Sequence, residues 1–154
     1  MVTIHSAVLT NTRTQTFFMK TKLLITLIST LIFAIACTRN PDLSDDAAKA
    51  AGSGTWRVSL LSERGTDDTP DFSGYGFTFS SNGIVTAING AFNKSGTWSA
   101  GSKKFNIDLG PKDNSNKPFG QLTDDWQIIS VTTTEITLTD DNTTTNKLLT
   151  FTKN

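Results

Sequence analysis

The sequence is poor in the residues that support redox and imidazole chemistry. Its 154 residues include one cysteine and one histidine, His5. A single cysteine excludes an intrachain disulfide and a cysteine-ligated zinc module. Basic and acidic residues balance at 14 each, so the chain lacks the basic excess of a dedicated nucleic-acid binder. What it has in quantity is threonine, at 26 residues, which favours strands, and its length favours one domain.

The longest apolar run is too short to cross a membrane. It covers Leu23–Ala36, 14 residues, whereas a spanning helix needs about 20. The basic cluster Met19–Lys22 precedes it and small residues end it. This order predicts a secretory signal peptide at 19–36. Residues 1–18 show no such pattern, and we interpret them as an over-extended start.

The four residues Ala34-Ile35-Ala36-Cys37 resemble the lipobox of bacterial lipoproteins. The resemblance implies cleavage before Cys37, acylation of that residue and anchoring in the outer membrane, at its periplasmic face or at the cell surface. Each buried acyl CH₂ contributes about 0.8 kcal/mol to membrane binding. One acyl chain anchors a protein only marginally, and two or more hold it stably. The alternatives are an ordinary signal peptide that happens to precede a cysteine, and an uncleaved anchor. Cleavage would also remove His5, so imidazole and thiolate catalysis would both be lost.

The segment 37–53 is polar and is predicted to be a lipid-anchored linker. Ser44 could cap a short helix over Asp45–Ala51, which Gly52 would end. As a flexible tether the segment would span roughly 20–24 Å. The acidic cluster that begins at Ser44 is open to two interpretations, a surface-export tag or a helix cap.

From Gly54 onward the pattern is almost entirely that of short strands. Apolar and polar residues alternate in several runs, and Asn82-Gly83 between two of them is a strong hairpin signal. The expected strands are Thr55–Ser62, Tyr75–Phe79, Ile84–Ile88, Gly96–Ser99, Phe105–Leu109, Trp126–Val131, Glu135–Thr139 and Lys147–Thr152. Their close spacing predicts an all-β domain over 54–154, a small antiparallel eight-stranded barrel. Because the strands are short, we expect its interior to be mostly filled.

Several motifs of this region resemble the small lipocalin-like domains of Gram-negative lipoproteins. In chain order they are Gly54-Thr55-Trp56, Phe77-Thr78-Phe79 before Asn82-Gly83, Gly96-Thr97-Trp98, Leu122 followed by Trp126-Gln127-Ile128, and Leu148-Leu149-Thr150-Phe151. The resemblance implies a lipocalin-like barrel and an aromatic interior. The interior residues expected to contact a ligand are Trp56, Tyr75, Phe77, Phe79, Trp98, Phe105 and Trp126. The alternative is that these rings only form the core, since a small domain needs such burial for stability.

Three carboxylate pairs are the remaining candidates for chemistry. Asp67-Asp68, Asp124-Asp125 and Asp140-Asp141 could serve acid–base catalysis or hold a calcium ion. Neighbouring strand residues point to opposite faces, however, and each pair lies near a predicted turn. Thr132–Thr134 and Thr143–Thr145 could contact glycans or could reflect strand propensity alone. We therefore expect no enzyme activity, no cofactor and no metal.

The prediction for the whole chain is a non-enzymatic, outer-membrane-anchored lipoprotein with a lipocalin-like barrel that binds a small apolar or amphipathic ligand. The alternative is a structural or interaction lipoprotein with a packed barrel, such as an envelope-complex accessory or an adhesin. A carboxylate hydrolase ranks third. The expected partners are the membrane, through acyl groups on Cys37, and a small hydrophobic ligand, but not nucleic acid.

Overall fold

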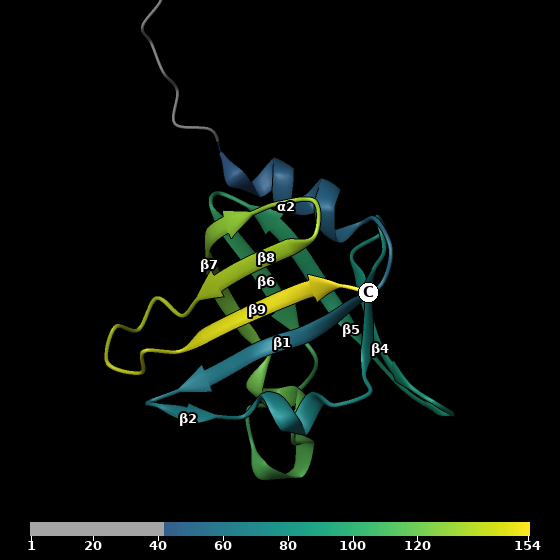
Figure 1. Ribbon diagram of the computed structural model, residues 1–154, viewed down its shortest axis with the longest axis vertical. Helices are drawn as coiled ribbons and strands as arrows, with labels where there is room; N and C mark the ends of the chain where they lie inside the picture. Colours follow the sequence, from purple (N-terminus) through teal and green to yellow (C-terminus); the bar gives the residue numbers. More distant parts are fainter. Residues whose placement is uncertain (1–41) are drawn as a thin grey trace, which may run out of the picture. The chain divides into compact units, whose positions relative to one another are not determined.

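Alternating side chains build a meander of antiparallel strands in the computed structural model, which describes residues 42–154 (Figure 1). The strands are β1 (Trp56–Glu63), β2 (Thr66–Asp67), β3 (Gly76–Phe79), β4 (Ile84–Asn89), β5 (Phe92–Gly101), β6 (Lys104–Asp108), β7 (Asp124–Val131), β8 (Glu135–Thr139) and β9 (Leu148–Lys153). All except β2 belong to a closed barrel, and β2 only extends β1 at one end. The predicted eight-stranded antiparallel barrel is confirmed.

The barrel is closed by its first and last strands. β1 and β9 pair from Trp56↔Lys153 to Ser62↔Leu148, with a bulge between Val58 and Leu60. The join between β1 and β3 is much weaker, because it consists of the single residue pair Trp56↔Phe77. We call this join the seam. Beyond that pair the two strands diverge, and the wall of the barrel is incomplete there.

Three short 3₁₀ segments cover the end of the barrel opposite helix α2 (Leu43–Ala51) (Figure 1). They are η2 (Thr69–Phe72), η3 (Asn114–Asn116) and η4 (Phe119–Gln121). Phe72 and Phe119 point inward from them and are almost fully buried. The aromatic interior beneath is continuous, since the ring of Phe79 lies 5.5 Å from Phe105 and 5.4 Å from Phe151. The expectation of a filled barrel is confirmed.

The strand bounds differ from the sequence prediction mainly in β5. This strand begins at Phe92 and not at Gly96, and it pairs with β4 from Asn89↔Phe92 to Ile84↔Thr97. Its first half has an exposed face, so it lacks the apolar alternation that marks a half-buried strand. The long β4–β5 hairpin projects from the barrel (Figure 1).

Within the segment predicted to be a linker, the part that the structure describes contains a helix that packs on the barrel. α2 (Leu43–Ala51) lies across one end, with Ala47 and Ala51 fully buried. Its N-cap is Asp42 and not Ser44: the Asp42 carboxylate accepts hydrogen bonds from the Ser44 hydroxyl and N–H, which lower the pKa of Asp42. The Ser44 hydroxyl in turn accepts from the Lys103 N–H at 2.7 Å. A two-turn helix is only marginally stable by itself. Burial of its alanine face against the barrel stabilises this segment, and the local sequence does not reveal that contact.

The two Gly-x-Trp motifs need glycine for different reasons. Gly54 adopts a φ of +90°, a conformation that disfavours side chains. Gly96 has ordinary strand geometry, but a Cβ there would overlap the backbone carbonyl oxygen of Asp108 on β6. Within 42–154, no helix is long and apolar enough to cross a membrane.

Candidate functional site

Most of the aromatic residues predicted to contact a ligand are buried in the core of the barrel. Trp56, Phe77, Phe105 and Trp126 are fully buried, and Phe79 nearly so. The two indole N–H groups donate to helix and loop carbonyls, Trp56 to Ala51 at 3.1 Å and Trp126 to Leu122 at 2.9 Å. These rings are held as core, and they line none of the cavities described below. Their role toward a ligand stays a prediction.

Trp98 and Tyr75 are the two predicted residues that reach the surface. Trp98 is half-buried, lies 5.3 Å from the Phe79 ring and donates its indole N–H to the Ser80 carbonyl at 2.9 Å. Tyr75 is also half-buried, and its ring packs edge-on against Phe119 at 5.2 Å. Of the seven predicted residues, Tyr75 lines a surface cavity of the described part of the chain.

A second aromatic group extends from Tyr75 toward the β4–β5 hairpin. Phe92 stacks on Phe119 with ring centroids 5.6 Å apart and a 9° tilt, and it meets Tyr75 edge-on at 5.9 Å. Phe92 is nonetheless 47% exposed, and neighbouring Ile88 is 46% exposed. Phe92 and Phe119 are not among the residues predicted from the sequence to contact a ligand, because both lie in segments without strand alternation.

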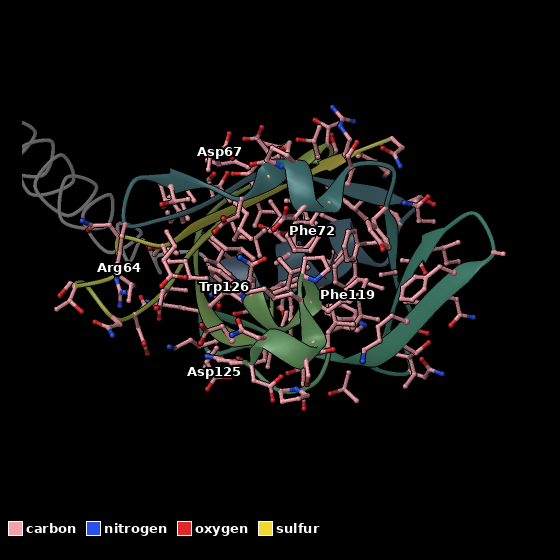
Figure 2. All side chains as sticks on the ribbon, turned by 90° about the horizontal axis from the view of Figure 1, so that it is seen from below. Arg64, Asp67, Phe72, Phe119, Asp125 and Trp126 are labelled. Atoms are coloured by element: carbon pink, nitrogen blue, oxygen red, sulfur yellow. The ribbon has the colours of Figure 1, made fainter. Side chains whose placement is uncertain are left out.

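The seam opens into a cavity of about 510 Å³, which we call the seam cavity. Its apolar residues are Val58, Phe72 and Tyr75, and its polar residues include Arg57, Asp67 and Asn154. Figure 2 shows Phe72 directed into the ring of strands while Asp67 lies outside it.

Polar groups at the mouth of the seam cavity are oriented by hydrogen bonds to other parts of the protein. Arg57 Nη1 donates to the Lys153 carbonyl at 3.3 Å and to Asn154 Oδ1 at 3.5 Å, which holds the guanidinium at the mouth. Hydrogen bonds from the Thr69 hydroxyl and N–H lower the pKa of Asp67, so that carboxylate is charged at neutral pH. An apolar floor with few oriented polar groups is the usual composition of a small-molecule site.

A second cavity, of about 290 Å³, lies between η4 and the β8–β9 loop, and we call it the polar cavity. Asp124 is its central acid: its Oδ2 lies 3.0 Å from Lys112 Nζ and 3.7 Å from Lys147 Nζ. Lys147 is buried, and its ammonium stands 4.9 Å above the Trp126 ring. Burial works to raise the pKa of Asp140, but bonds from the Asn142 N–H and Thr145 hydroxyl, with the charge of Lys147, lower it overall.

No known family model and no curated protein matches this chain. Solved structures do resemble it. A DUF4847 family protein from Bacteroides vulgatus has a TM-score of 0.51 and 18% identity, covering 70% of this chain and 97% of that one. A lipocalin-like protein from Bacteroides uniformis has a TM-score of 0.51 and 17% identity, covering 68% and 99%. The fold is lipocalin-like. At these identities the likeness establishes the fold alone.

In the lipocalin-like barrel, Asp67 lines the seam cavity, whereas Asp124 and Asp140 both line the polar cavity. Asp67 and Asp140 bond to backbone N–H groups two residues ahead, as expected of turn residues. Asp124 instead begins β7 and contacts two lysines, a role that the sequence analysis did not predict. Among residues 42–154, no group of three His, Cys, Asp or Glu side chains could hold a metal ion.

Each of the two threonine runs contributes local hydrogen bonds to a turn or loop of the lipocalin-like barrel. The Thr132 hydroxyl accepts from the Glu135 N–H at 2.9 Å in the β7–β8 turn. The Thr145 hydroxyl donates to Asp140 Oδ2 at 2.9 Å in the β8–β9 loop. The predicted signal peptide and the lipidation of Cys37 lie outside the described residues.

Proposed function

We propose that the protein is a non-enzymatic lipoprotein of the outer membrane, anchored through acyl groups on Cys37, that holds a small amphipathic ligand outside its barrel. The observation that carries the ligand proposal is the seam cavity. It combines an apolar floor at Phe72 and Tyr75 with a guanidinium at its mouth, whereas the barrel interior is occupied by the protein's own rings. The anchor rests on the lipobox-like residues that end at Cys37.

The proposed anchor fixes which end of the barrel faces the membrane. The residues from Thr38 to Asp42 reach at most about 17–18 Å even when fully extended. α2 follows directly and lies across one end of the barrel, with η2 at the other end. An acylated Cys37 would therefore keep the α2 end near the lipid and leave the η2 end, beside the seam cavity, directed away from it.

The anchor is tested by Cys37→Ser. We expect the variant to accumulate as an unprocessed precursor and to lose acyl labelling, because the acylated thiol is the substrate of maturation in the proposed scheme. Labelling with a radioactive or clickable fatty acid in the native host measures this. Thr38→Ser is the control and should be processed normally. Normal labelling of Cys37→Ser would reject the anchor.

Ligand binding is tested by filling the seam cavity with a side chain. Ser73 lines the cavity and is exposed, so Ser73→Tyr should occupy it with little effect on stability. With dodecanoate as the probe, followed by NMR shifts of Tyr75, we expect affinity to fall by about tenfold or more, which equals about 1.4 kcal/mol. Ser95→Tyr, on an exposed β5 position away from the cavity, should bind as the parent does. Equal binding by both variants, or none by the parent, would contradict the proposal.

The second candidate function is a scaffold that acts through its surface. The filled interior and the exposed apolar side chains of Phe92 and Ile88 on the β4–β5 hairpin favour it. Native mass spectrometry of the protein from its own envelope separates the two functions. A retained small molecule that is released on denaturation supports the ligand proposal. An unliganded mass together with no response to dodecanoate supports the scaffold.

A further inference from the structure

Lys147 is a buried cation whose ammonium has unused donors. Its residue is 7% exposed. Within the described part of the chain its Nζ makes no hydrogen bond, the nearest acid being Asp124 Oδ2 at 3.7 Å. The Trp126 face offers electrostatic attraction but no acceptor atom. Because an ammonium carries three N–H donors, this group can still donate to an acceptor from outside the protein.

An acceptor without a partner lies in the lining of the same cavity. Gln121 Oε1 is buried and has no hydrogen-bond partner among the described residues. Gln121 and Lys147 both line the polar cavity, Gln121 on η4 and Lys147 in the loop just before β9. A buried acceptor left unpaired costs free energy, because its hydrogen bond to water is lost and not replaced. Two residues in the cavity lining therefore carry an unused donor group and an unused acceptor.

The charges around the polar cavity disfavour an ion as its occupant. Three lysines line it against four carboxylates: Lys112, Lys117, Lys147, Glu63, Asp113, Asp124 and Asp140. An anion would meet the carboxylates, and a cation would meet the lysines. Asp124 is already shared by two lysines, and both oxygens of Asp140 already accept hydrogen bonds.

We propose that the polar cavity binds a neutral, hydroxyl-rich ligand, a sugar ring being the class that fits. A hydroxyl donates and accepts at once, so adjacent hydroxyls would accept from Lys147 Nζ and donate to Gln121 Oε1. The volume of about 290 Å³ lies at the lower limit for ligand pockets, which suits one ring. This site is separate from the seam cavity and does not depend on it.

The test is a titration of the whole protein with free hexoses. Glucose, galactose, mannose and N-acetylglucosamine are the probes. Binding is followed by the fluorescence and NMR shifts of Trp126, because the Trp126 ring lies beneath Lys147. Lys147→Met keeps most of the aliphatic stem and removes the ammonium. We expect it to weaken binding by about tenfold or more, as for loss of a hydrogen bond to a charged group. Lys94→Met, outside the cavity, should bind as the parent does.

A second variant keeps the proposal testable if Lys147→Met fails to fold. Gln121→Met removes an oxygen that has no partner, so it should preserve stability while it weakens hexose binding. No response to any hexose at high concentration overturns the proposal. So does saturable binding of acetate or inorganic phosphate at the same residues, since that would show an anion site. Hexose binding that neither variant weakens would place the sugar elsewhere and would also overturn it.

Discussion

Gly96→Ala is expected to break the pairing of β5 with β6 and to destabilise the barrel severely. A Cβ at Gly96 would overlap the Asp108 carbonyl oxygen and lie 3.0 Å from Leu109 Cα. All of these atoms are backbone, so no side chain can rotate away and β6 itself must move. Overpacking of a core costs about 1–3 kcal/mol when side chains adjust, and we expect this substitution to exceed that range. Urea unfolding followed by fluorescence measures the loss.

Gly101→Ala on the same strand is the matched control. Gly101 ends β5, and a Cβ there would meet no atom within 4 Å. Removing a glycine from such a position is neutral or stabilises by about 0.4–1 kcal/mol, because the unfolded chain loses freedom. A loss of stability equal to that of Gly96→Ala would show that flexibility, and not the approach of β6, explains the motif.

Trp126→Ala is expected to lower the free energy of unfolding by about 3–5 kcal/mol, the range for removing a fully buried large aromatic residue. Trp126 is 0% exposed, and its indole N–H satisfies the Leu122 carbonyl at 2.9 Å. Removing it leaves a cavity, an unpaired carbonyl and a Lys147 ammonium without its aromatic face. Three penalties thus act at one position. Thermal and urea unfolding of the purified variant measure their sum.

Trp98→Ala provides the comparison within the same protein. Its indole N–H also donates to a backbone carbonyl, that of Ser80, at the same 2.9 Å. Trp98 is half-buried, however, so less apolar surface returns to water and no closed cavity forms. We expect a clearly smaller loss than for Trp126→Ala. Equal losses would mean that the hydrogen bonds, and not burial, dominate the stability of these aromatic sites.

The sequence was most informative where a local rule coincides with the tertiary structure. Alternation located eight strands, and the hairpin predicted at Asn82-Gly83 forms there, with Gly83 at a φ of +83° and the Asn82 side chain accepting from the Ile84 N–H. A short helix over Asp45–Ala51 was considered from the sequence, and the structure has a helix over Leu43–Ala51. Its packing on the barrel was not predicted, because that depends on the barrel end that Ala47 and Ala51 meet.

The candidate sites could not be predicted because their residues come together only in the closed barrel. The seam cavity brings Arg57 beside Tyr75 through the divergence of two strands, which no local pattern encodes. The polar cavity joins Asp124 to Lys147 across two loops. Nothing in the local sequence around Lys147 indicated that it would be buried against Trp126.

The closure between β1 and β9 has a consequence for how the chain acquires its fold. Every strand from β3 to β8 pairs with the next one along the chain, so those hairpins are short-range events. Trp56↔Lys153 joins residues at opposite ends of the domain, and such non-local pairing slows folding toward milliseconds to seconds. The ribosome must therefore release almost the whole domain before β1 and β9 can pair and close the barrel. Until then the nascent polypeptide cannot complete the barrel, and a chain in that unfolded state could still pass through a protein-conducting channel.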